Sequence, residues 1–179
     1  AIQRENLNNV LVIKENGEFL SASVMKPIII RSPAGLFKVA GIGSVVTNPQ
    51  FRNQGLSRQV LESCIQAGRD HGCDFAILWT NLFDFYRKFG FELAGTEVAL
   101  TLPSTFKPPE FQGLRFMTTS RIDPEAILRL YNSHTTGSLR TADDIRKFLQ
   151  IPNSRIYTAW SPDQRLEAYA VEGKGADLT

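Results

Sequence analysis

The sequence predicts an α/β fold, here an α+β arrangement in which a mixed central sheet is flanked by helices. Three observations predict it. Residues 10–25 have the pattern of a β-hairpin, with an Asn-Gly turn in the middle. Residues 36–46 form a third strand-like run, and an amphipathic helical pattern begins at residue 56. A further apolar run at residues 74–79 follows that helix, and the order strand, helix, strand is typical of a parallel pair within a sheet.

The first three predicted strands follow one another closely. The hairpin arms are residues 10–14 and 19–25, and residues 27–31 prolong or follow the second arm before a Ser-Pro-Ala-Gly break. The third run contains Gly41 and Gly43. Glycine inside a strand indicates a bulge or a close backbone neighbour, so we expect a bulge near residues 41–44.

The helical pattern places its apolar residues at steps that form one buried face. These residues are Leu56, Val60, Leu61, Cys64 and Ile65. Glycines at residues 68–72 end the helix, and residues 74–79 are predicted to be a short buried strand. Residues 82–89 form a short aromatic helix that Asn81 caps and Gly90 stops, and residues 91–102 are predicted to add one or two strands.

A second pattern follows a proline-rich segment. We expect a first domain over residues 1–103 and a linker over residues 104–113, with a partial second unit, or a segment that completes the first, over residues 114–179. In this last part the predicted elements are a strand at 114–121, helices at 123–133 and 141–150, and a hairpin formed by 155–160 and 165–171.

Composition excludes several classes of function. The 179 residues are 42% hydrophobic with a net charge of +2, and scattered basic residues do not predict nucleic-acid binding. No apolar run approaches the roughly 20 residues that span a bilayer, and the opening residues do not resemble a signal peptide, so we expect no membrane association. Cys64 and Cys73 lack the spacing of a zinc site or a disulfide framework, which favours a reducing, cytoplasmic location.

Residues 51–57 connect the third predicted strand to the predicted helix. A helix N-terminus leaves about four backbone N–H groups without partners and concentrates positive partial charge there. A phosphate at residues 53–57 would therefore meet several donors, and Gly55 lets a ligand approach the backbone closely. An ordinary strand-to-helix turn is the alternative interpretation of the same residues.

Two sequence motifs, at residues 45–57 and 85–91, resemble those of the GNAT superfamily of acetyl-CoA-dependent N-acetyltransferases. Residues 45–57 are similar to its diphosphate loop, usually Gln/Arg-x-x-Gly-x-Gly/Ala, with Arg52 and Gly55 at two of the marked places. Ser57 departs from the usual Gly or Ala at the third place but is also small. Residues 85–91, Phe-Tyr-Arg-Lys-Phe-Gly-Phe, are similar to its Tyr-x-x-x-Gly-Phe signature. Eis-type and tandem bacterial members resemble the chain most. The resemblance covers about the first hundred residues and implies a GNAT-like acyl-CoA N-acyltransferase fold.

The resemblance also implies a site and a reaction. Acetyl-CoA would be the co-substrate without a metal, Tyr86 would protonate the leaving thiolate, and the Val45 N–H would polarise the thioester carbonyl. No general base is assigned, and no covalent enzyme intermediate is expected. The expected cofactor-binding residues are Val45, Val46, Thr47, Arg52, Asn53, Gln54, Gly55, Leu56 and Ser57.

The chain departs from the family at its beginning. Family members usually open with a strand and two helices, whereas this chain starts at the hairpin, and residues 114–178 look like such an opening. It does not begin with Met, so we expect a processed chain or a piece of a longer one. The leading hypothesis is acetyl transfer to a primary amine on a small molecule, peptide or protein, with a homo-oligomer left open. A non-catalytic CoA-binding or assembly module, and a different nucleotide-binding protein, are the alternatives.

Overall fold

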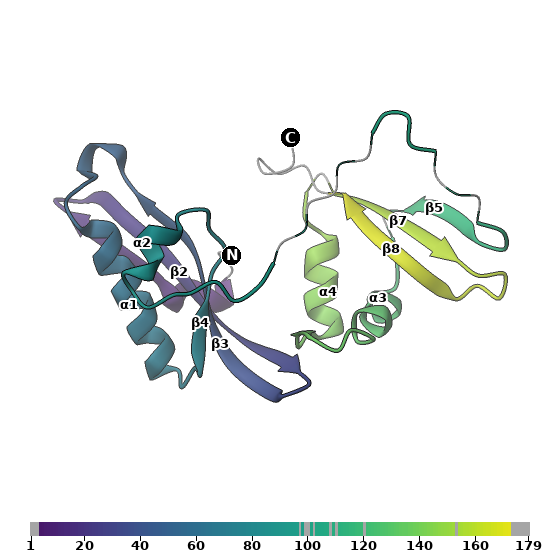
Figure 1. The fold of residues 1–179 in the computed structure, drawn as a ribbon, viewed down its shortest axis with the longest axis horizontal. Coiled ribbons are helices and arrows are strands. Elements are labelled where there is room, and N and C mark those ends of the chain that lie inside the picture. The colour runs from purple at the N-terminus through teal and green to yellow at the C-terminus, as the bar shows by residue number, and fades with distance from the viewer. Residues whose placement is uncertain are drawn as a thin grey trace. The chain divides into compact units, whose positions relative to one another are not determined.

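The computed structural model describes residues 4–96, 98, 101, 103–107, 109, 111–119, 121–152 and 154–172. The chain forms two compact units, residues 1–97 and residues 98–179, each with its own sheet (Figure 1). In the parts of the chain so described, no helix is both long and apolar enough to cross a bilayer.

The first unit is built on a mixed sheet in the order β1-β2-β3-β4. Pairing is antiparallel from β1 to β3 and parallel between β3 and β4, as the element order predicts. Its elements are η1 (Arg4–Asn9), β1 (Val10–Glu15), β2 (Glu18–Ser32), β3 (Gly35–Thr47), η2 (Pro49–Phe51), α1 (Leu56–Asp70), β4 (Phe75–Ile77) and α2 (Phe83–Arg87).

The hairpin turn has the conformation that its sequence predicts. Asn16 and Gly17 have φ angles of 49° and 85°, and positive φ at both central residues is the reason that Asn-Gly is favoured in two-residue hairpin loops. Beyond the turn, β2 continues without a break through Pro27, which pairs with Ala40 of β3. The predicted run at residues 27–31 therefore prolongs the second strand.

The helix α1 makes the crossover between the parallel strands and covers one face of the sheet. Its residues Leu61 and Cys64 are fully buried against Met25, Ala40 and Ile42. The short helix α2 packs on the same cluster through its aromatic side chains, so both helices lie on one side of the sheet (Figure 1). This arrangement brings α2 to the sheet face that α1 covers.

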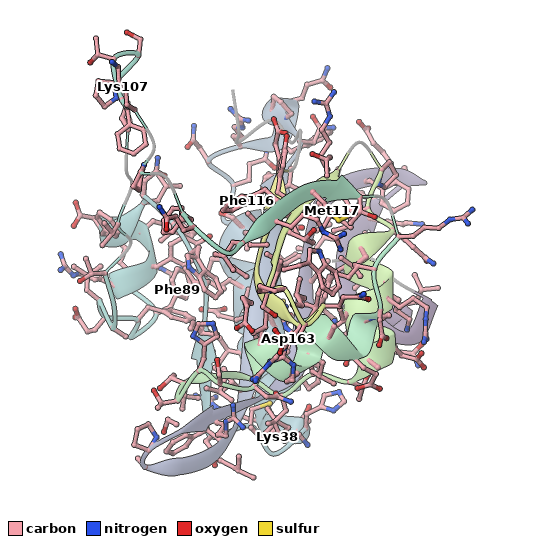
Figure 2. The ribbon with its side chains drawn as sticks, turned by 90° about the vertical axis from the view of Figure 1, so that its right-hand side faces the viewer. Lys38, Phe89, Lys107, Phe116, Met117 and Asp163 are labelled. Carbon is pink, nitrogen blue, oxygen red and sulfur yellow. The ribbon has the colours of Figure 1, made fainter. Side chains whose placement is uncertain are left out.

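The end of α1 and the start of β4 are tied to β3 at Lys38, which is labelled in Figure 2. The Lys38 N–H donates to the Asp74 carboxylate (2.8 Å), and the Asp74 N–H donates to the Lys38 carbonyl (2.7 Å). The Lys38 ammonium also donates to the His71 carbonyl. These bonds explain why β4 starts in register at Phe75, opposite Val39.

Two strand predictions in this region are wrong. The predicted buried strand at residues 74–79 is shorter, Phe75–Ile77, and Trp79 lies beyond its end and is 77% exposed. Residues 91–96 form no strand, while residues 97, 99, 100 and 102 lie outside the described residues. Only Phe91 in this segment packs on the core, so residues 92–96 have no apolar face to hold them in a sheet.

The second unit has an antiparallel sheet in the order β5-β7-β8 and a core of Ile127, Ile145 and Leu166. Both predicted helices are present, and their caps follow the sequence: Asp123 accepts from the Glu125 N–H, and Thr141 forms a capping box with Asp144. The elements are β5 (Arg115–Thr119), α3 (Pro124–Tyr131), β6 (Gly137–Ser138), α4 (Ala142–Leu149), β7 (Arg155–Trp160) and β8 (Leu166–Glu172).

Candidate cofactor and catalytic site

A β-bulge interrupts the pairing of β2 with β3 near the end of β3. Ala22 pairs with Val46 but Val24 pairs with Gly43, so Ser23 alone lies opposite both Ser44 and Val45. Ser44 has a φ of 54°, which a residue other than glycine seldom adopts. The predicted bulge is thus confirmed, although the extra residue lies just beyond the two glycines that indicated it.

The bulge changes which side chains of β3 face α1. Ala40 and Ile42 belong to the buried cluster under α1, and two-residue alternation would next direct residue 44 there. The extra residue instead lets Val45 pack against that cluster, while Val46 is exposed. Val45 is therefore held by the core immediately after the distorted backbone.

The turn from β3 into α1 leaves a helix N-terminus open. Asn48 caps η2 by accepting from the Gln50 N–H (3.1 Å), and the chain then turns through Asn53 and Gly55, whose φ angles are 63° and 78°. Gly55 is the N-cap of α1 and has no side chain to occupy the first-turn N–H groups. The predicted residues Arg52, Asn53, Gln54 and Gly55 are exposed, and Leu56 and Ser57 begin the helix.

Tyr86 lies in α2 between two aromatic rings. Its ring meets those of Phe85 and Phe91 edge-on, with centroids 5.0 and 6.0 Å away. Desolvation by partial burial raises the pKa of the Tyr86 phenol above its ordinary value of 10.0. Tyr86 also packs on the buried cluster that holds Val45, so the structure brings both predicted residues to one core.

A contact between aromatic and cationic groups joins α1 to the segment after α2. The Arg58 guanidinium, in the first turn of α1, lies over the Phe89 ring with 4.9 Å to its centroid. Phe89, labelled in Figure 2, contacts Phe85 in turn with centroids 5.3 Å apart. The start of α1 and the helix that carries Tyr86 are therefore connected through side chains.

Tyr86 lines a groove of about 640 Å³ within the first unit. Its wall includes the exposed aromatic side chains of Trp79 and Phe83, together with Thr80. At the polar side, Arg87 is 3.4 Å from the Glu92 carboxylate. The groove offers apolar surface and a few polar groups beside the phenol, a composition typical of small-molecule sites.

Other side-chain chemistry is sparse near this site. Among the described residues, no group of three or more His, Cys, Asp or Glu side chains is placed to hold a metal ion. Cys64 is fully buried, and desolvation raises the pKa of its thiol, so a reactive thiolate is disfavoured there.

Sequence reasoning missed some residues of the site and gave one a wrong role. Asn81 does not cap α2: its N-cap is Leu82, and the Thr80 hydroxyl accepts from the Leu82 N–H (2.9 Å). Two serines of β2, Ser21 and Ser23, are buried against the bulge. The available signal was the spacing of two polar residues at alternate positions in an otherwise apolar strand.

The match of a family model to the first unit decides which family the chain belongs to. A family model described as "Acetyltransferase (GNAT) domain" matches residues 2–94, more than half of the chain. The chain belongs to the GNAT acetyltransferase family. The predicted resemblance and the predicted GNAT fold are both confirmed.

Three solved structures are similar over more than nine-tenths of the chain. They are a probable N-acyltransferase from Enterococcus faecalis (16% identity, 96% of this chain and 47% of that chain, TM-score 0.67), Eis1 from Mycobacterium abscessus (16%, 92% and 44%, 0.65) and a GCN5-related N-acetyltransferase from Kribbella flavida (16%, 94% and 43%, 0.59). At this identity the likeness shows the fold alone. The chain spans less than half the length of these proteins. No curated protein sequence matched it.

Proposed function

We propose that this GNAT chain carries the cofactor half of an N-acetyltransferase that moves acetyl from acetyl-CoA to a primary amine. The observation that carries the proposal is a spatial one. The bulge at Ser44 and Val45 precedes η2 and the turn that opens the N-terminus of α1, and Val45 and Tyr86 pack on the same buried cluster. An amide beside a strand end, an anion site and a phenol are the three groups that the reaction needs.

In this proposal the diphosphate of acetyl-CoA binds at the turn before α1. The uncapped first-turn N–H groups and the cationic side chain of Arg52 supply donors and positive charge. The pantetheine arm, which has amide groups of its own, pairs with the backbone of Val45, Val46 and Thr47. The residues assigned to the diphosphate are Arg52, Asn53, Gln54, Gly55, Leu56 and Ser57.

The proposed chemistry is direct transfer. The amine nitrogen attacks the thioester carbonyl carbon, the Val45 N–H stabilises the negative charge that develops on the carbonyl oxygen, and the carbon–sulfur bond breaks. The Tyr86 hydroxyl gives its proton to the leaving thiolate, and the nitrogen loses a proton to solvent or to a base that is not assigned. A phenol is a suitable acid here because it remains protonated at neutral pH.

The test is to incubate the chain with acetyl-CoA and a panel of amines and to follow the release of free thiol. Small amines, amino sugars and peptides with a free N-terminus should all be included. Thiol release that depends on one class of amine supports the proposal and names the acceptor. Binding of acetyl-CoA without thiol release from any amine would contradict it.

A glycine at the proposed diphosphate turn gives a prediction for binding. Gly55→Ala puts a side chain on a residue with φ of 78°, and an L-residue there costs about 1–2 kcal/mol unless the turn changes. A changed turn no longer aligns its N–H groups, so we expect the Kd for CoA to rise about tenfold. This loss of binding free energy is close to the net contribution of one charged hydrogen bond. Calorimetry measures the Kd.

The matched control for this prediction is Gly17→Ala in the β1–β2 turn. Gly17 has φ of 85°, and a Cβ at either glycine would have no heavy atom within 4 Å. The two variants therefore carry the same backbone strain and lack steric clashes. Equal CoA affinity in both variants would remove the α1 turn from the binding site.

The phenol predicts how turnover depends on pH. Because burial raises the pKa of Tyr86 above 10.0, the group keeps its proton at every lower pH and loses it only as pH rises through the shifted value. We therefore expect kcat to rise as the acceptor amine deprotonates, with any falling limb that reports Tyr86 centred above pH 10. Initial rates across the alkaline range measure this, and a falling limb well below pH 10 would speak against Tyr86 as the acid.

A non-catalytic CoA-binding or assembly module is the second candidate. It is favoured by one observation: β3, Gly35–Thr47, carries no carboxylate that could accept the proton of the attacking amine. This candidate predicts CoA binding without turnover, so the thiol assay separates the two. Four further points stay predictions. They are the acceptor class, a cytoplasmic location, a homo-oligomer, and the role of residues 114–179 as a partial second GNAT-like unit or a segment that completes the first.

A further inference from the structure

Two buried serines of β2 lie directly behind the bulge. Ser23 is fully buried and Ser21 is 4% exposed, in a strand whose other buried residues are apolar. A hydroxyl in such a place is stabilised only when it is hydrogen-bonded, and an apolar residue would otherwise be favoured. Both hydroxyls do have partners, and those partners are backbone carbonyls of β3.

The two carbonyls stand on either side of the bulge. The Ser23 hydroxyl donates to the Gly43 carbonyl (3.2 Å), and the Ser21 hydroxyl donates to the Val46 carbonyl (2.8 Å). Between these carbonyls lie only Ser44, in its left-handed conformation, and Val45. The serines therefore fix the backbone immediately before and immediately after the distorted residues.

Further contacts hold the serines themselves in place. Ser21 is 3.0 Å from the Thr47 hydroxyl, and Ser23 lies beside the Cys64 thiol of α1. Cys64 is fully buried in the core on which Tyr86 packs. The pair of serines thus connects the bulge with the helix whose N-terminus is assigned to the diphosphate.

We propose that Ser21 and Ser23 are positioning residues that hold the bulge so that the Val45 N–H meets the thioester carbonyl of the bound coenzyme. This inference rests on the proposed function. The left-handed residue at the bulge is Ser44, and such a conformation in a non-glycine residue persists only when its surroundings impose it. The two serine–carbonyl bonds are contacts that impose it.

The experiment compares three variants with a matched control in the full chain. Ser21→Ala, Ser23→Ala and the double variant each remove a hydroxyl that donates to a carbonyl. Ser63→Ala removes a bond of the same kind, from the Ser63 hydroxyl to the Gln59 carbonyl (2.9 Å), on the exposed surface of α1. Ser21→Thr keeps the hydroxyl and tests rescue.

We expect the double variant to lower kcat about tenfold, which is less than the effect of losing an oxyanion donor outright. The Kd for acetyl-CoA should stay within about threefold of the wild-type value. Each single variant should have a kcat between those of the wild type and the double variant, while Ser63→Ala and Ser21→Thr should keep wild-type turnover. The Val45 amide should show a shifted 1H–15N signal in the alanine variants. Melting temperatures identify any variant whose folded fraction has dropped.

Two results would overturn the inference. One is an unchanged Val45 amide in both single variants, and the other is a changed amide with unchanged kcat. Failure of the proposed function is recognised separately, since wild-type chain that releases no thiol contradicts the reaction before any variant is made. The amide measurement needs no turnover, so it tests the positioning role even if the wild-type chain releases no thiol. In that case an unchanged Val45 signal overturns the positioning role, and a shifted signal supports the conclusion that the serines fix the bulge.

Discussion

Tyr86→Phe is expected to lower thiol release more than tenfold while leaving the affinity for acetyl-CoA within a factor of about two, on the scale of general-acid effects. The substitution removes one hydroxyl and keeps the ring. Its edge-on contacts with Phe85 and Phe91 involve ring atoms alone, so α2 and its packing on the core should be unchanged. The measurements are steady-state rates and calorimetric titration with acetyl-CoA.

A second tyrosine supplies the control. Tyr157, in the second unit, donates its hydroxyl to Glu172 (2.6 Å), and Tyr157→Phe should leave turnover at the wild-type value. An acyl donor whose thiol is more acidic needs less protonation on leaving, so with such a donor the Tyr86→Phe deficit should shrink. A deficit of the same size for every donor would assign Tyr86 a role other than proton transfer, and unchanged turnover would remove it from the mechanism.

The parts of the fold that could be predicted are those set by short-range signals. The Asn16-Gly17 pair predicted the hairpin, and the helical spacing of apolar residues predicted α1. Asp123 followed by Pro124 predicted the start of α3. Each signal acts within a few residues, through φ preference, periodicity or a capping bond. The GNAT motifs likewise lie in two short continuous stretches.

What could not be predicted depends on pairing between distant segments. The bulge was expected near residues 41–44 and is present, but the exact residue in the left-handed conformation, Ser44, depends on the register of β2 against β3. The roles of Ser21 and Ser23 follow from that register too. Residues 91–96 form no strand because only Phe91 packs on the core, and the sequence alone does not show which apolar residues of a segment will find such a contact.

Leu61→Ala is expected to destabilise the first unit by about 3 kcal/mol, within the range for fully buried leucines. Leu61 is fully buried between α1 and the sheet, and its loss would leave a cavity beside Met25 and Ile42. The better helix propensity of alanine offsets only a few tenths of a kcal/mol of this. Hydrogen exchange of β2, β3 and α1 peptides across a urea series measures the free energy of unfolding of this unit.

Leu36→Ala is the control, since Leu36 is 63% exposed and should contribute less than about 1 kcal/mol. Acetyl-CoA at a hundred times its Kd should stabilise wild type and Leu61→Ala equally, by about 2.7 kcal/mol, if the variant leaves the site intact. A smaller increment in the variant would mean that the core under α1 also shapes the turn that binds the coenzyme. A loss below 1 kcal/mol for Leu61→Ala would instead contradict the packing described for this core.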